Sequence, residues 1–509
     1  MTGRSPNRPV ESDARTEGLR FRRQFFLGPT PLGGLEGWHR VQLTDKFALT
    51  IHPDLEFHRA VAGGRSLTLL GFLLDPEDPA ATSLDILERL LREMDDAVRL
   101  PELTNMLGGR WALLAMDERR SILFHDAGGQ RSVYYGRRAA SEGIRCASQP
   151  GLLATALDAS IDPEARDSMC SPGCRTYWLP GDTSLFEGIR ALLPNHYLDL
   201  DQGTAHRYWP TSETELPRWN DPVAESARIL ERTVEAAARR YPLALSMTAG
   251  WDSRLTLALG RPHRDRLYSF TLAYHFSPRD IPDHTIPARL LSRLGMAHRL
   301  LLPPARIDGS FDSACREANP SAKETSFVEA QALLEGSPPG RLCITGDVAE
   351  VVKCLYRNTG GEGEPLTPHG LASLCRAGSH PFAIRAFEFW LAGAPRAGPI
   401  HLLDLFCWEQ MVGRWQALIR SEFDIVQDSF SPLNSRHLVM GMLTVDEGER
   451  RPPDHVFLRR LIERLWPEVL MEPINPPEPV RLRNVVSRVL DGVGMSRSLR
   501  DRLRRLRGI

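Results

Sequence analysis

The segment that most constrains the fold is residues 248–253, Thr-Ala-Gly-Trp-Asp-Ser, which joins an apolar run at 241–247 to a helical pattern at 254–259. A short apolar run that leads through small residues into a helix is typical of a parallel α/β sheet. Residues 266–272, 285–294 and 298–302 continue as strand, helix and strand, with Gly295 closing the helix. The pattern predicts a doubly wound sheet that binds ligands at the carboxyl ends of its strands.

The residue types in the 248–253 loop suit a polyphosphate. Gly250 lets backbone N–H groups approach phosphate oxygens, and the helix N-terminus that follows favours negative charge. Thr248 and Ser253 offer hydroxyl donors, whereas Asp252 would repel phosphate and is better interpreted as a ligand of a bridging Mg²⁺. We therefore expect this loop to bind ATP, and we expect the ATP to be cleaved between its α and β phosphates. The structural alternative is an ordinary small-residue turn with a capping aspartate.

The loop resembles the S-G-G-x-D-S signature of the asparagine synthetase family, with Thr248 and Ala249 in place of the first Ser and Gly. The resemblance implies that the whole loop, Trp251 included, binds ATP and pyrophosphate.

A second loop follows the apolar residues 341–344 and resembles the family's S-G-E-G-A-D-E segment. The resemblance assigns Thr345, Gly346 and Asp347 to pyrophosphate binding. It also makes Glu350 the second Mg²⁺ ligand and a catalytic residue together with Asp252, while Val351 replaces the family's final Glu. Two carboxylate loops, each at a strand's carboxyl end, predict a cradle for Mg-pyrophosphate.

Two further positions belong to this comparison. Asp283, five residues before Ala288, matches the family's D-E-x-x-x-A segment, but we favour the alternative that it caps the helix beginning near Thr285. Asn475 falls where the family carries the Lys that stabilises charge on the acyl-adenylate, so it is a catalytic candidate without the charge. The residues that could supply the positive charge of that Lys are Lys353, Arg459 and Arg481.

The first half of the chain resembles the class II glutamine amidotransferase fold, a sandwich of antiparallel sheets. Residues 107–115 and 121–125 alternate like paired strands, and a turn at 126–131 leads to a strand at 133–135. Working enzymes of that class use an N-terminal cysteine, whereas this chain begins Met1-Thr2-Gly3 and its first cysteine is Cys146. We therefore expect no glutaminase activity, as in β-lactam synthetases and lasso-peptide cyclases.

The expected fold is α/β, with an antiparallel β-sandwich followed by a doubly wound parallel-sheet synthetase domain and a helical C-terminal part. A Pro-rich stretch at 208–222 sets the boundary, and residues 404–415 have the spacing of a core helix. The predicted domains are an amidotransferase-like domain (1–210), an ATP-binding domain (211–480) and a basic amphipathic tail (481–509). The tail could dock an acidic peptide, a membrane surface or RNA, and a solvated terminal helix is the favoured alternative.

Composition sets bounds on partners and location. With 509 residues, of which 42% are apolar and 25% charged, the chain can bury large cores. A net charge of −1 argues against general nucleic-acid binding. The eight cysteines are scattered, which favours free thiols in a reducing compartment over a zinc site. We find neither a secretion signal nor an apolar run long enough to span a membrane, and expect a cytoplasmic protein.

Together these features predict an ATP- and Mg²⁺-dependent ligase that adenylates a carboxylate and joins it to an amine, with AMP and pyrophosphate released. The substrate is a small molecule or a peptide that carries both groups. Lasso-type macrocyclisation, with a precursor peptide and a protease as partners, fits an intramolecular amine. The alternatives are a small-molecule or glycan-modifying amide synthase of the same family and a catalytically impaired scaffold or binding subunit.

Overall fold

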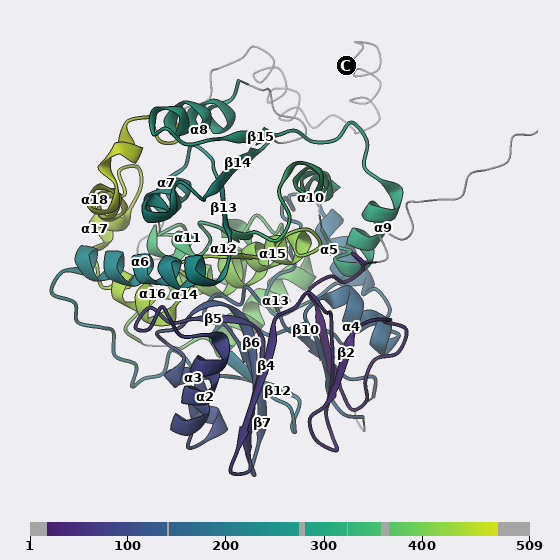
Figure 1. Cartoon of the computed structure of the whole chain (residues 1–509). Coiled ribbons are helices and arrows are strands. Elements are labelled where there is room, and N and C mark those ends of the chain that lie inside the picture. Colours follow the sequence, from purple (N-terminus) through teal and green to yellow (C-terminus); the bar gives the residue numbers. More distant parts are fainter. Residues whose placement is uncertain are drawn as a thin grey trace, which may run out of the picture.

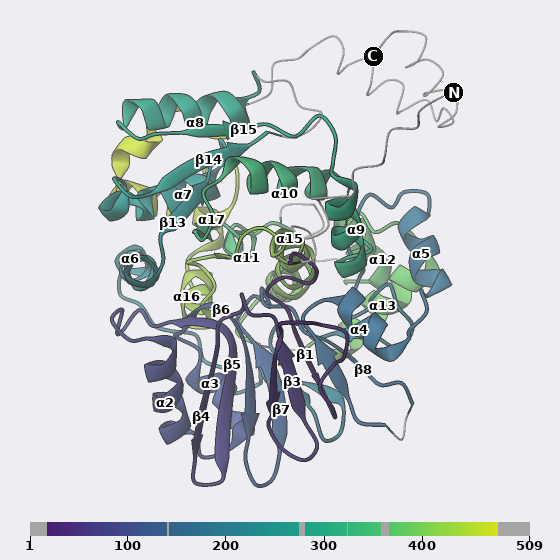
Figure 2. The ribbon, with the colours of Figure 1, turned by 45° about the vertical axis from the view of Figure 1, so that its right-hand side comes forward.

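The computed structural model of this protein describes residues 18–139, 142–273, 280–322, 324–357, 366–395 and 398–476. Over these ranges the strands form two antiparallel sheets of six strands and one parallel sheet of five. The antiparallel sheets lie together at one end of the molecule, and the parallel sheet with its helices lies at the other (Figures 1 and 2). The predicted tail at 481–509 lies outside the described residues.

Both antiparallel sheets come from the first half of the chain. The strands of the first sheet, in spatial order, are β10 (Arg190–Ala191), β8 (Tyr134–Gly136), β9 (Arg145–Ala147), β1 (Phe25–Gly28), β3 (Ala48–Ile51) and β2 (His39–Gln42). Those of the second are β12 (Thr204–Arg207), β11 (His196–Asp199), β7 (Ser121–His125), β6 (Gly108–Met116), β5 (Arg65–Leu74) and β4 (Phe57–Ala62). Side chains of both sheets, such as Leu49 and Leu114, share one buried core. The predicted paired strands are confirmed as β6 and β7.

The parallel sheet comes from the part of the chain that follows residue 242. In spatial order its strands are β15 (Arg299–Leu301), β14 (Tyr268–Leu272), β13 (Leu243–Ser246), β16 (Leu342–Ile344) and β17 (Ser429–Phe430). Leu243 and Leu245 of β13 join the core formed with α6 (Pro222–Arg240) and α7 (Trp251–Leu259), whereas Ala244 packs with Leu333 of α10 (Glu324–Gly336). Both faces are therefore covered by helices, as the alternation of strand and helix in the sequence predicts.

The remaining helices surround these sheets. They are α2 (Ser83–Glu93), α3 (Leu100–Leu103), α4 (Pro150–Leu157), α5 (Pro163–Cys170), α8 (Pro282–Arg293), α9 (Gly309–Ala318), α11 (Ala349–Val352), α12 (Pro368–Leu374), α13 (Pro381–Gly393), α16 (Arg436–Leu443), α17 (Glu447–Arg450) and α18 (Val456–Leu465). Short 3₁₀ turns are η1 (Ala97–Arg99), η2 (Arg261–His263) and η4 (Pro467–Leu470). Among the helices in the described ranges, none has the length and apolar character needed to cross a bilayer.

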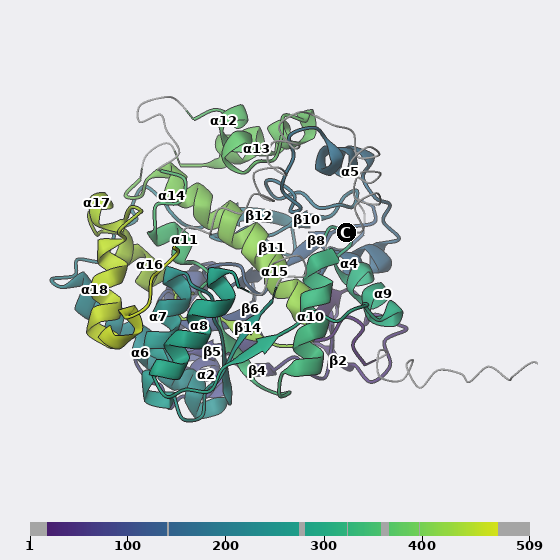
Figure 3. The same cartoon turned by 90° about the horizontal axis from the view of Figure 1, so that it is seen from above.

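The predicted core helix at 404–415 is confirmed and is longer than expected. It runs through α14 (Leu402–Phe406), a π-helical stretch η3 (Cys407–Gln416) and α15 (Ala417–Phe423). Figure 3 shows it crossing the middle of the molecule, where η3 contacts α11 and α15 contacts α10. π-Helical turns are rare and are often found at functional sites.

The N-cap predicted for Asp283 is wrong. Helix α8 begins at Pro282, whose fixed φ suits the first helical position, and Ile281 is the N-cap. Asp283 instead accepts a hydrogen bond at 2.9 Å from the backbone N–H of Ala249, in the loop after β13. A tertiary partner has replaced the local capping contact that the sequence suggests.

A buried charge network joins the second antiparallel sheet to the segment between α15 and β17. Arg110 on β6, 1% exposed, pairs with Asp424, 2% exposed, and lies 2.9 Å from a carboxylate oxygen of Asp428. Arg131 also pairs with Asp428 at 3.2 Å. Burial alone would raise the pKa of Asp428, but Arg131 and Arg110 outweigh it and hold the pKa at about 2. The network fixes the segment that leads into β17 against the sandwich.

We predict that Arg110→Met lowers the free energy of unfolding by about 3–5 kcal/mol, because it removes one of the two arginines that compensate Asp424 and Asp428 and leaves their charge only partly paired. The matched control is Arg239→Met, which removes an exposed pair with Glu235 at 2.7 Å and should cost less than about 1 kcal/mol. Urea unfolding followed by tryptophan fluorescence compares the two. Equal losses in both variants would contradict the structural role of the network.

Candidate functional site

The two predicted loops meet at the carboxyl edge of the parallel sheet. In the parallel pairing of β13 with β16, Leu245 lies opposite Ile344, so both strands end together. The loops then touch: a Cβ built on Gly346 would lie 2.4 Å from the Cβ of Asp252. The missing side chain at Gly346 is what allows this approach.

The first loop holds its shape with its own polar groups. Ser253 Oγ donates to the carbonyl of Thr248 at 2.9 Å, and Thr248 Oγ1 accepts from the N–H of Gly250 at 3.2 Å. Gly250 is the N-cap of α7, and Asp252 lies in its first turn. The first N–H groups of a helix have no acceptor within the helix. The predicted hydroxyls therefore shape the loop, and the first N–H groups of α7 remain as donors that could face an anion.

Residues closer to the C-terminus of the chain hold the second loop in place. Asp347 accepts from the hydroxyl of Thr345 at 2.9 Å and pairs with Arg420 at 3.1 Å. Ser431 Oγ donates to the carbonyl of Asp347 at 2.6 Å. The carboxylate of Asp347, predicted to contact pyrophosphate, thus already has a cation beside it, and Arg420 is a site residue that the sequence reading missed.

A strained residue, Val348, is the N-cap of the short helix α11. Val348 has φ of +76°, a left-handed conformation that a β-branched side chain disfavours. Its N–H donates to Gln416 Oε1 at 2.9 Å, and Gln416 Nε2 donates to Glu350 Oε2 at 2.7 Å. The π-helical stretch η3 therefore supplies the side chain that orients Glu350, and sequence analysis did not single out Gln416.

The two predicted metal-binding carboxylates converge on one cation, Lys353. Its Nζ lies 2.7 Å from Asp252 Oδ2 and 3.5 Å from Glu350 Oε1. Burial raises the pKa of Asp252 to about 6, with Lys353 opposing that shift and Glu350 adding to it. Burial would lower the pKa of Lys353, but Glu350 and Asp252 raise it above its usual value. The structure thus brings Asp252 and Glu350 together around the ammonium group of Lys353.

Asn475 lies against the first loop, although it is more than two hundred positions away in the sequence. Its backbone N–H donates to the carbonyl of Ala249 at 3.0 Å, and its φ is +45°. Its side-chain oxygen lies 3.4 Å from the point that a Cβ on Gly250 would occupy. The position predicted from the family's catalytic Lys is therefore at the loop, and it carries a neutral amide.

Trp251 opens on a cavity of about 560 Å³ beside the first loop. The guanidinium of Arg459 lies 5.3 Å from the centre of the indole, and the ring of His455 lies 5.8 Å from it, edge on. Asn475 and Glu472 also line this cavity. Of the proposed substitute cations, Lys353 and Arg459 both lie at the loop, and Arg481 is outside the described residues.

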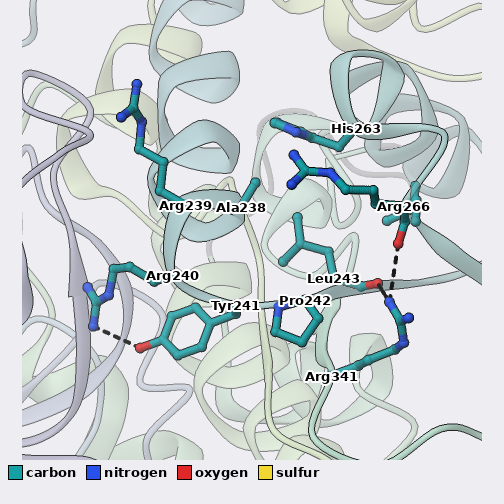
Figure 4. Close-up of a pocket in the computed structure, with 10 residues that line it drawn as sticks. Ala238, Arg239, Arg240, Tyr241, Pro242, Leu243, His263, Arg266 and Arg341 are labelled. Carbon is teal, nitrogen blue, oxygen red and sulfur yellow. Dashed lines mark hydrogen bonds between the residues drawn. The ribbon is translucent and has the colours of Figure 1, made fainter.

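A second cavity, of about 520 Å³, lies at the opposite, amino edge of the same sheet. Figure 4 shows that Arg239 points away from it and that Arg240 turns to the hydroxyl of Tyr241. Arg341 donates to the backbone carbonyls of Leu243 and Arg266. Most of its arginines are therefore engaged or turned aside, and it lies at the wrong edge of the sheet for the ligand of a doubly wound fold.

Cys146, which lies in the sandwich core, is not an activated nucleophile. All eight cysteines are free thiols in the described ranges. Cys146, on β9, is buried, and burial raises the pKa of its thiol well above the usual value. A thiol must ionise to attack a carboxamide, so this position is unsuited to glutamine hydrolysis.

Comparison with known proteins gives little further guidance. No protein-family model matches the chain, and no curated protein does. A glutamine-dependent NAD⁺ synthetase from Acinetobacter baumannii, in complex with ADP, is 19% identical over 34% of this chain and 37% of that one, with a TM-score of 0.20. This chain thus spans about a third of that synthetase.

Two further solved structures are similar at 12% identity and a TM-score of 0.24. A glutamine PRPP amidotransferase from B. subtilis, complexed with ADP and GMP, covers 67% of this chain and is covered over 73% of its own length. The match to an allosteric regulatory enzyme of purine biosynthesis covers 61% of this chain and 75% of that enzyme's chain. These likenesses are faint, and membership of the asparagine synthetase family stays a prediction.

We predict that Gly346→Ala forces the two loops apart and lowers the free energy of unfolding by about 1–3 kcal/mol, because the new methyl meets backbone and Cβ atoms that cannot yield. Gly309→Ala is the control, since nothing lies within 4 Å of a Cβ there. Urea unfolding measures both variants. A Gly346→Ala variant as stable as the control would contradict the close approach of the loops.

Proposed function

We propose that this chain is an ATP-dependent ligase that activates a substrate carboxylate as an acyl-adenylate, joins it to an amine and releases AMP and pyrophosphate. The observation that carries the proposal is the meeting of Asp252 and Glu350 on one cation, at the carboxyl edge of a parallel sheet. A nucleotide polyphosphate needs cations and N–H donors at the same place. Both are present at this edge.

The first loop, residues 248–253, is the proposed seat of the β and γ phosphates. The N–H groups that open α7 would donate to phosphate oxygens, and the helix N-terminus stabilises their charge. Thr345 and Gly346 would close the other side of the phosphates. The carboxylate of the substrate then attacks the α phosphorus, the bond to the bridging oxygen breaks, and pyrophosphate leaves with the electron pair.

Mg²⁺ fits this proposal as the ion that accompanies the nucleotide. Asp252 Oδ1 is buried and has no hydrogen-bond partner among the described residues, so it is an acceptor left over for a cation. Asp252, through Oδ1, and Glu350 would hold this ion once the nucleotide brings it to the site. When bound, the ion neutralises charge on the departing pyrophosphate.

The amine is proposed to come from the substrate and not from glutamine. Cys146 is buried and its pKa is raised, which supports a domain without glutaminase activity. The proposed domains remain residues 1–210 for this part and residues 211–480 for ATP binding. A carboxylate and an amine in one molecule would react at high effective concentration. Macrocyclisation of a peptide is the finer version of the proposal, and closure of a small molecule is its alternative.

A catalytically impaired scaffold is the competing function. Asn475 and Val351 are both uncharged where the family that the sequence resembles has charged residues. In favour of the enzyme, both proposed metal ligands are retained, and Lys353 and Arg459 place two cations at the loop.

The products of ATP decide between these functions. With ATP labelled at its α phosphate and substrate candidates from the native host, we predict labelled AMP, unlabelled pyrophosphate and no glutamate from added glutamine. Glu350→Gln should slow pyrophosphate release by about a hundredfold or more, the usual scale for loss of one preorganised charge contact. The control is Asp265→Asn, at an exposed carboxylate outside the site. ADP as the sole product would exclude the mechanism, and no product with any candidate would favour the scaffold.

A further inference from the structure

Three carboxylates and two cations gather where the two loops meet. Arg420 belongs to Asp347, which it contacts at 3.1 Å. Lys353 alone serves both Asp252 and Glu350. Within the described residues, the site therefore has one positive charge for the two carboxylates that were predicted to share a metal ion.

The position of the Lys353 ammonium is set from several directions. Lys353 is the C-cap of α11 and follows Glu350 by three residues, so its side chain lies on the same face of the turn. Gln416 holds the far oxygen of Glu350 at 2.7 Å and leaves Oε1 toward Lys353. Gly346 lets the two loops come close enough for a single ammonium to reach both carboxylates.

We propose that the Lys353 ammonium is a built-in cation of this site, which takes the place of one divalent ion between Asp252 and Glu350. It keeps the carboxylate pair together before a nucleotide arrives, and it reduces the number of metal ions that the loaded site needs. The role of this lysine in nucleotide binding rests on the proposed function. The position of the ammonium between Asp252 and Glu350 does not depend on that proposal.

Electrostatics give the proposal its direction. Two carboxylates at one point repel each other unless a cation compensates them. With Lys353 in place, a divalent ion that binds between the two carboxylates without a nucleotide would have to displace or crowd an ammonium at 2.7 Å from Asp252 Oδ2. Without Lys353, the same two carboxylates would present a double negative charge of the kind that binds Mg²⁺ or Mn²⁺.

The test is to remove the ammonium and measure binding of Mn²⁺ alone, with no nucleotide present. We expect Lys353→Met to bind Mn²⁺ at least about tenfold more tightly than the wild type, by electron paramagnetic resonance of the free ion, because the carboxylate pair loses its own cation. Mn²⁺ should also raise the Tm of Lys353→Met and leave the wild-type Tm unchanged. The double variant Asp252→Asn with Lys353→Met should lose the gained binding.

Two controls match the substitution. Lys46→Met removes an exposed lysine that pairs with Asp201 at 2.9 Å, and it should leave Mn²⁺ binding as in the wild type. Lys353→Arg keeps the charge and should also behave as the wild type. If Lys353→Met folds only when Mn²⁺ is added, the proposal is supported.

Equal Mn²⁺ affinity in Lys353→Met and the wild type would overturn the proposal. So would a Lys353→Met variant that fails to fold with or without Mn²⁺ while Lys353→Arg folds, because a metal then cannot replace the ammonium. The test uses no nucleotide, so either result concerns only the role of Lys353. A failure to bind ATP would contradict the ligase proposal and not this one.

Discussion

The parallel pairing of β13 with β16 is the constraint on which the candidate site depends. It aligns Leu245 with Ile344, so that two loops about a hundred residues apart in the chain leave the sheet side by side. Everything proposed for the site follows from this adjacency: the contact of Gly346 with Asp252, and the single lysine that reaches carboxylates of both loops. A shift of one residue in this register would move Asp252 and Glu350 out of reach of the same cation.

The antiparallel half of the molecule contributes to the site by position. Its buried arginine on β6 fixes Asp424 and Asp428, and the chain passes from there into β17. Phe430 of β17 accepts the backbone N–H of Thr345, and Ser431 holds the carbonyl of Asp347. The sandwich thus braces the second carboxylate loop from behind, which gives this half of the chain a role that needs no catalytic thiol.

Local patterns in the sequence predicted the strands, the loops and the core helix because each depends on neighbouring residues: an apolar run, a glycine, a helical spacing. Long-range partners could not be predicted in that way. Asp283 looks like a cap by its neighbours, yet its partner is Ala249, and Gln416 looks like a core-helix position until the fold sets it beside Glu350. The sequence indicates Lys353 only as one of three candidate cations, because no neighbouring residue shows that Asp252, at the start of α7, lies beside it.

The most direct test of the account is a crystal structure of the protein with Mg²⁺ and α,β-methylene-ATP, which cannot be cleaved between its α and β phosphates. The account predicts that the triphosphate lies between the loops at 248–253 and 345–350, with its phosphates on the N–H groups that open α7 and beside Asp252 and Lys353. A nucleotide bound elsewhere, for example in the arginine-lined cavity at the amino edge of the sheet (Figure 4), would contradict it.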